Sequence, residues 1–115
     1  MRRLNGHDIF AAVRVTKEAG MKEEVKKIAA LLNAGKKLNI REIGIEFVVN
    51  MLGGLADVGA EDKFWKFCAG PFEMTEKEVA ELPIMDVIEK FKELAALEDA
   101  EAWKTFFRSV AQLTK

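Results

Sequence analysis

The chain has 115 residues, of which 50% are apolar and 32% are charged, and its 18 basic and 19 acidic side chains leave a formal net charge of −1. This composition is typical of one globular domain, residues 1–115, and it argues against a disordered chain or a general binder of nucleic acid or anionic membranes. The only cysteine, Cys68, excludes an intramolecular disulfide.

Apolar residues recur at helical spacing along nearly the whole chain, so we expect an all-α fold of about six or seven helices in one compact domain around an apolar central helix. The first helix is predicted from about His7 to Ala19, with Asn5 as its N-cap and Gly20 as its stop. Phe10, Val13 and Lys17 share one face of this helix.

The second helix is predicted from about Lys22 to Asn33. Glu23 and Glu24 lie in its first turn, and Lys36 and Lys37 lie just past its end. Acidic residues at the start of a helix and basic residues at its end both suit the helix dipole.

The third helix opens with Asn39-Ile40-Arg41-Glu42, which resembles a capping box, and is apolar on most sides as far as Leu55. A helix that is apolar all round should be central and buried. Gly53-Gly54 marks either a break or a close approach by another helix; the cost of about 1 kcal/mol for each helical glycine favours the break. A fourth helix then covers about residues 60–69 and ends at Gly70-Pro71.

Residues 75–78 (Thr-Glu-Lys-Glu) form a capping box for a short helix that Pro83 stops. We expect Asp86 to cap the next helix, and a last helix to follow Glu98-Asp99. Apolar residues of that last helix recur at a regular helical spacing: Trp103, Phe106, Phe107, Val110 and Leu113.

Membrane association is not expected. The most apolar stretch, residues 47–56, has about half the length that a membrane span needs. The basic N-terminus is not followed by an apolar run, so it does not resemble a signal peptide. We therefore expect a cytosolic protein.

No catalytic or metal-ligating constellation stands out in the sequence. His7 is the only histidine, which excludes sites that need two, and its position beside Asp8 is typical of a polar first turn. Cys68 lies among apolar residues, as an unreactive core thiol would. Gly53-Gly54 lacks the Lys-Ser/Thr of a phosphate loop. We expect a non-enzymatic protein with no catalytic residue, no metal and no cofactor.

Nucleic-acid binding is the class to test separately, since small helical domains often bind DNA. The densest basic stretch, residues 22–37, has five lysines and no arginine. Recognition helices usually carry Arg, Asn or Gln on an exposed face. The sequence therefore does not favour a nucleic-acid partner.

Apolar residues near the C-terminal half remain as candidates for a protein-binding surface. Phe72 and Met74 lie in the predicted loop before Thr75, and Trp103 begins an aromatic face of the last helix. The Trp103/Phe106 side of that helix suits the core, whereas the side with Phe107 and Val110 could line a groove for a partner. The candidate partner-binding residues are Phe72, Met74, Trp103, Phe107 and Val110.

Four segments, in this order and spacing, resemble the tail assembly chaperones of long-tailed bacteriophages that infect Gram-positive bacteria. They are the opening Leu4-Asn5-Gly6-His7-Asp8-Ile9-Phe10, the apolar residues 43–55, the segment 74–83 from Met74 to Leu82-Pro83, and the terminal Phe106-Phe107-Arg108-Ser109-Val110 with residues 111–113. The resemblance covers nearly the whole chain, but its motifs are packing and capping patterns. It transfers no individual site residue.

The resemblance implies a protein that binds the tape measure protein, keeps its apolar helices soluble and helps the tail tube protein to assemble around it. In many relatives a ribosomal frameshift adds a second domain that engages the tube protein, and this chain looks like the shorter product. The implied location is the host bacterial cytoplasm, with the protein absent from the mature virion.

Three alternatives stay open beside this expectation. A head–tail connector or another phage structural protein would form stable rings, and a small helical DNA-binding regulator would bind DNA in a salt-dependent way. A homo-oligomer also fits, because residues 1–60 carry a net charge of +3 and residues 61–115 a net charge of −4, which could favour head-to-tail contacts.

Overall fold

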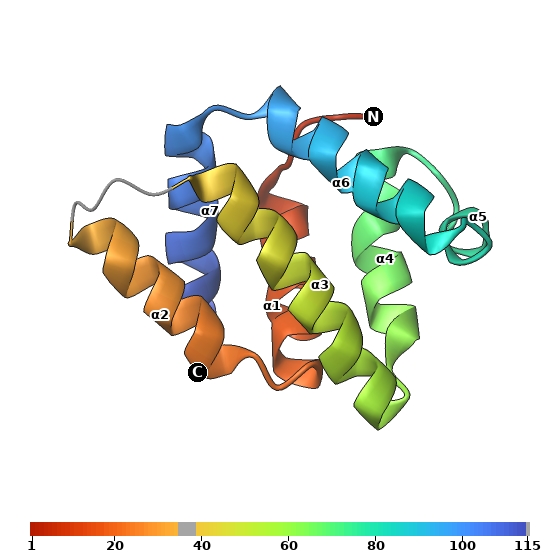
Figure 1. The fold of residues 1–115 in the computed structure, drawn as a ribbon, viewed down its shortest axis with the longest axis horizontal. Coiled ribbons are helices and arrows are strands. Elements are labelled where there is room, and N and C mark those ends of the chain that lie inside the picture. The colour runs from red at the N-terminus through yellow and green to blue at the C-terminus, as the bar shows by residue number, and fades with distance from the viewer. Residues whose placement is uncertain (35–38, 115) are drawn as a thin grey trace.

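The computed structural model describes residues 1–34 and 39–114, and over these residues the chain is all-α with seven helices and no strand. The helices are α1 (Gly6–Glu18), α2 (Lys22–Asn33), α3 (Ile40–Val58), α4 (Glu61–Phe72), α5 (Glu76–Ala80), α6 (Ile84–Leu97) and α7 (Ala100–Leu113) (Figure 1). The all-α prediction is confirmed. Lys36 and Lys37, expected to follow α2, lie outside the described residues.

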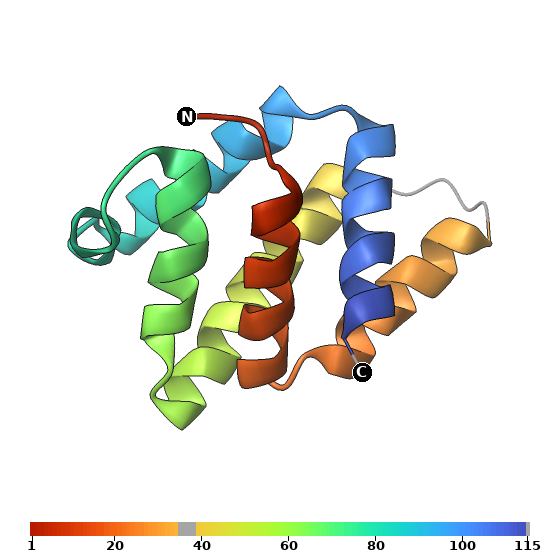
Figure 2. The same ribbon diagram turned by 180° about the vertical axis from the view of Figure 1, so that it is seen from behind.

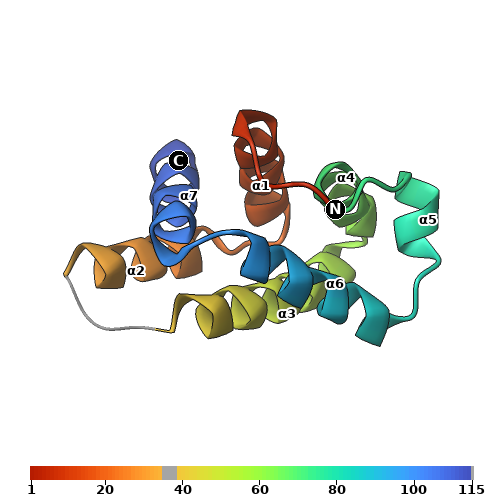
Figure 3. The same ribbon diagram turned by 90° about the horizontal axis from the view of Figure 1, so that it is seen from above.

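The helices form two layers that cross each other (Figure 3). One layer holds α7, α1 and α4 side by side, and α1 in the middle contacts both of its neighbours (Figure 2). The other layer holds α2, α3 and α6, of which α3 and α6 are in contact. The short α5 lies at the edge, against α4.

Helix starts follow the local capping signals. Asn5 accepts the backbone N–H of Asp8, and the Asp8 carboxylate accepts the N–H of Asn5 in return. Thr75 makes the same reciprocal pair with Glu78, and Asn39 accepts the N–H of Glu42. These three predicted caps are confirmed.

One predicted cap is wrong. Asp86 does not cap α6, because the helix already begins at Ile84 with Pro83 in the N-cap position. The Pro83 carbonyl accepts the first-turn N–H groups of Asp86 and Val87 at 2.9 and 3.2 Å. Asp86 instead lies inside the first turn, where its charge suits the helix dipole.

The break that we favoured at Gly53-Gly54 is wrong, and the alternative of close helix packing is correct. Helix α3 continues through both glycines to Val58, and Gly59, with a φ of 66°, ends it. A Cβ added at Gly54 would lie 2.4 Å from the carbonyl oxygen of Ala19, at the end of α1. Gly54 therefore allows the α3 backbone to approach the end of α1 closely.

The predicted stop of the fourth helix at Gly70-Pro71 is also wrong. Helix α4 runs through both residues to Phe72, and Glu73 takes the left-handed conformation with a φ of 56°. Glu73 N–H bonds the Gly70 carbonyl and Met74 N–H bonds the Ala69 carbonyl, both at 3.1 Å, which is a Schellman motif. The turn thus falls on a glutamate instead of the preceding glycine.

The N-terminal segment, residues 1–4, explains why Gly70 is needed inside the helix. The Arg2 guanidinium forms two bonds to the buried carboxylate of Asp8, at 2.7 and 3.0 Å, and Arg2 N–H bonds the Pro71 carbonyl. This bidentate bond raises the pKa of Arg2. A Cβ at Gly70 would lie 2.6 Å from the Arg2 Nη2 atom, so a larger residue there would make the guanidinium shift from its position on Asp8.

A single apolar cluster joins all seven helices. Four phenylalanines meet at its centre, where Phe64, Phe67 and Phe72 surround Phe91. On α1, Phe10 shares a face with Val13 but is 57% exposed, whereas Val13 is buried.

The outward side of α3 is likewise open, with Val49 47% exposed, although α3 contacts α1, α4, α6 and α7. Helix α3 lies in one of the two layers and faces solvent on one side. The expectation that a helix apolar on most sides is buried all round is therefore wrong for α3.

Candidate functional site

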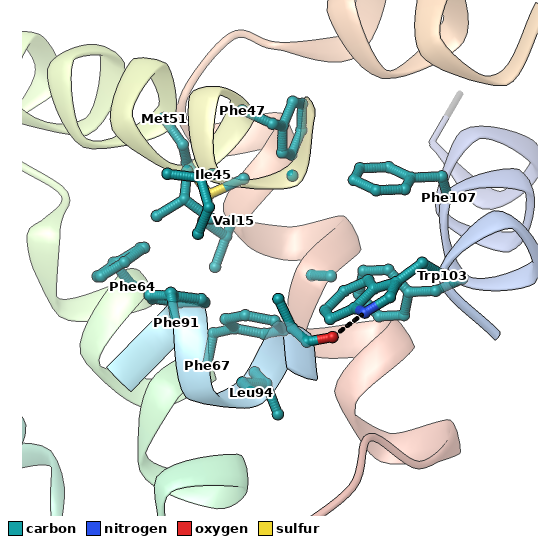
Figure 4. A pocket seen from close by; sticks show the side chains of 15 residues that line it. Val15, Ile45, Phe47, Met51, Phe64, Phe67, Phe91, Leu94, Trp103 and Phe107 are labelled. Carbon is teal, nitrogen blue, oxygen red and sulfur yellow. Dashed lines mark hydrogen bonds between the residues drawn. The ribbon is translucent and has the colours of Figure 1, made fainter. Parts of the chain in front are cut away.

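An apolar pocket lies where α1, α3, α4, α6 and α7 meet (Figure 4). Its cavity volume is about 50 Å³, and no charged side chain lines it among the described residues. The lining residues are Ala12, Val15, Gly44, Ile45, Phe47, Val48, Met51, Phe64, Phe67, Phe91, Leu94, Ala95, Trp103, Phe106 and Phe107.

The pocket opens between α3 and α7. Ten of its lining residues are buried, and the half-buried ones are Gly44, Ile45, Val48, Trp103 and Phe106, all on these two helices. The rings of Phe47 and Phe107 pack edge to face with centroids 5.7 Å apart, and Phe107 lies 6.3 Å from Trp103. Aromatic side chains from both helices therefore line the pocket behind this opening.

Among the described side chains that line the pocket, the one polar group is already hydrogen-bonded. The Trp103 indole N–H donates to the Ala95 carbonyl at 3.1 Å, across the junction of α6 and α7 (Figure 4). This bond fixes the indole ring and leaves its apolar face toward the cavity. The pocket can therefore offer apolar contact, and its described side chains offer no group for acid–base or nucleophilic chemistry.

Two of the five predicted binding residues, Trp103 and Phe107, come together in this pocket. Phe72 and Val110 belong to the buried core, with 4% and 2% of their surface exposed. Met74 is half-buried and packs on the core after the Schellman turn. Partner binding by any of these residues stays a prediction.

One side of α7 differs from our expectation. The Phe107/Val110 side, which could have lined a groove for a partner, is buried, whereas Trp103 and Phe106 are half-buried and pack against the core as expected. The reason is that α7 packs against α1, α2 and α3 together, which covers more than one of its faces. The sequence pattern predicted that α7 has a broad apolar face, but it did not predict which part of that face the other helices would cover.

Sequence reasoning missed the pocket residues on α3, above all Gly44. A glycine in a helix interior that causes no break usually has a packing or functional reason. A Cβ added at Gly44 would meet only the Cζ atom of Phe107, at 4.0 Å. Gly44 thus forms part of the pocket wall and leaves space in front of Phe107.

Potentially reactive side chains lie apart from this pocket. Cys68 is buried in α4, and burial raises the pKa of its thiol well above the ordinary value. His7 is exposed in the first turn of α1. Among the described residues, no group of three or more His, Cys, Asp or Glu side chains could hold a metal ion. No helix in the part of the chain that the structure describes has the length and apolarity of a membrane span.

No protein-family model, no curated protein and no solved structure matches the chain. The apolar pocket and the order of the sequence motifs are therefore the features of the chain that bear on its function.

Proposed function

We propose that this chain is a non-enzymatic tail assembly chaperone of a long-tailed bacteriophage, which binds the tape measure protein and assists assembly of the tail tube. The observation that carries the proposal is the apolar pocket between α3 and α7, walled by Trp103 and Phe107. It supports a protein that works by apolar contact with another chain. The order of the sequence motifs supports the phage tail as its setting.

The physical task of such a chaperone is to cover apolar helix surface for a limited time. Burying one large aliphatic side chain is worth about 1.5–3 kcal/mol, part of which is lost to the ordering of both partners. A contact centred on one small pocket is therefore reversible, as a chaperone that later releases its client requires. In this proposal the protein acts in the host bacterial cytoplasm and does not remain in the mature virion.

Co-expression with the tape measure protein of the same genome tests the proposal directly. We expect the tape measure protein to be insoluble alone, and to become soluble and co-purify when this chain is present. The gene that encodes it should lie immediately downstream of this one. If the tape measure protein is neither rescued nor co-purified, the proposal is wrong.

Two neighbouring valines of α3 provide a matched pair for this experiment. Val48 lines the pocket, whereas Val49 is 47% exposed and is not among the lining residues. We expect Val48→Asp to abolish the rescue and Val49→Asp to preserve it. Circular dichroism checks that both variants fold. If Val48→Asp does not fold, Val48→Thr, whose side chain has nearly the same shape as valine, replaces it as the test variant.

The other functions have their own readouts. Stable rings seen by light scattering, without affinity for the tape measure protein, would indicate a connector subunit or another phage structural protein. A DNA fragment retained in a gel-shift assay at physiological salt would indicate a regulator. Binding of the tail tube protein, through a frameshifted longer form, is tested by adding that protein to the co-purification.

A further inference from the structure

The pocket is too small for a whole ligand of ordinary size, which narrows what it can accept. Its volume of about 50 Å³ is a third of the roughly 150 Å³ cavity that admits benzene. A group with few carbon atoms fits that space. We propose that the pocket is a socket for the end of one aliphatic side chain, Leu, Ile or Met, on the partner helix, and that Gly44 keeps this socket open. The partner helix in this inference rests on the proposed function.

The fold itself does not explain the glycine at position 44. Glycine is less favourable than alanine in a helix interior, and Gly44 has no positive φ that would require it. At Gly54 an added Cβ would meet a backbone oxygen and at Gly70 the Arg2 guanidinium, each within 3.0 Å, whereas at Gly53 it would point into open space. At Gly44 the Cβ would meet one ring atom of Phe107 in ordinary contact. A methyl group at position 44 would therefore reduce the volume of the pocket.

The walls of the socket select the chemistry of the group that enters. A lysine or arginine end would bury a charge where the described lining offers no counter-charge, which costs several kcal/mol in other proteins. The phenyl ring of a phenylalanine is larger than the branched end of a leucine, so the ring is the poorer fit to this volume. Phe47, Phe107 and Trp103 are held by their mutual packing and by the indole hydrogen bond, so the walls resist widening. An aliphatic end remains as the matching occupant.

Small molecules that copy side-chain ends test the socket without the partner. The probes are isobutane for leucine, toluene for phenylalanine and n-butylammonium for lysine, each titrated into the folded chain. The readout is the indole N–H signal of Trp103 in nitrogen–proton spectra, and Trp65, which does not line the pocket, is the internal reference. We expect isobutane to give a saturable shift at Trp103, and the other two probes to give none.

Two alanine variants of the same helix give the decisive comparison. Gly44→Ala places a methyl group in the pocket wall, whereas Gly53→Ala places it where no atom lies within 4 Å. We expect Gly44→Ala to weaken isobutane binding about fourfold or more, the value of one methylene contact, and Gly53→Ala to leave it unchanged. Both changes favour the helix, so neither should unfold the chain.

The outcomes separate this inference from the proposed function. The socket is ruled out if isobutane gives no saturable shift at Trp103, or if toluene or n-butylammonium also gives one. It is equally ruled out if the Gly44→Ala variant binds isobutane with the affinity of the unmodified chain. Rescue of the tape measure protein without isobutane binding would overturn the socket and leave the chaperone standing. Isobutane binding without rescue of the tape measure protein would overturn the proposed chaperone function. It would also overturn the proposal that a side chain of the partner helix occupies the socket.

Discussion

Replacement of Gly54 by alanine tests how closely α1 and α3 pack. The new Cβ would lie 2.4 Å from the Ala19 carbonyl oxygen, and real Cβ atoms essentially never come within 3.0 Å of such a neighbour. The two helices must therefore separate by roughly half an ångström or more. The atom that the methyl group meets belongs to the backbone, so no side-chain rotation can relieve the contact.

The expected magnitude follows from two opposing effects. Alanine favours the helix by about 1 kcal/mol over glycine, and overpacking costs about 1–3 kcal/mol. A backbone clash belongs at the upper end of that range, so Gly54→Ala should lower the free energy of unfolding by about 1–2 kcal/mol. Gly53→Ala, which meets nothing within 4 Å, should raise it by about 0.5–1 kcal/mol.

Urea denaturation followed by tryptophan fluorescence measures both values, and circular dichroism checks the helix content. The two variants should differ by about 1.5–3 kcal/mol in free energy of unfolding, or by roughly 10 °C in midpoint temperature for a chain of this length. Equal stability of the two variants would refute the close approach of α3 to Ala19. So would a stabilised Gly54→Ala protein.

Four further predictions concern individual side chains and one strained backbone position. Asp8→Ala should lower the free energy of unfolding by about 2–3 kcal/mol in urea denaturation, because it leaves Arg2 and the Asn5 N–H without their acceptor; Arg2 is 29% exposed, which places the cost below that of a fully buried pair. Glu73→Gly should raise the midpoint temperature, since glycine adopts the left-handed conformation without strain, and an unchanged or lower midpoint would contradict this. The Cys68 thiol should react with a thiol reagent at pH 8 only after unfolding in urea, because it is buried and its pKa is raised. The hydrogen bonds to Thr75 lower the pKa of Glu78. The stabilisation by the Glu78 carboxylate should therefore be complete above the pKa of a free glutamate and be lost as the pH falls from about 5 toward 3. Glu78→Gln should remove this part of the pH dependence of stability.

Local interactions made much of the fold readable from the sequence. The caps at Asn5, Asn39 and Thr75 act within three or four residues, so the residues that make them lie together in the sequence. The Gly20 stop is equally local, because its positive φ suits glycine at the end of a helix. Helix α2 has the bounds that its apolar spacing predicts, Lys22–Asn33.

The features that we could not predict from the sequence depend on contacts between distant segments. Gly54 faces Ala19 and Gly70 faces Arg2, so the reasons for both glycines lie far away along the chain. Pro71 stays inside α4, where the N-terminal segment supplies a partner for its carbonyl. The pocket has the same origin, since Gly44 gains its meaning only from the ring of Phe107, which lies 63 positions later in the sequence.

The central place of α1 in its layer constrains the order in which a growing chain can fold. Helix α1 is synthesised before its two neighbours in the layer, α4 and α7, which begin only at residues 61 and 100 (Figure 2). One flank of α1 therefore stays uncovered until α4 has been synthesised and the other until α7 has, and contacts between such distant segments form slowly. A ribosome stalled before α7 should hold a nascent chain that proteases cleave readily, whereas a nascent chain in which the 14 residues of α7 have also emerged should be resistant.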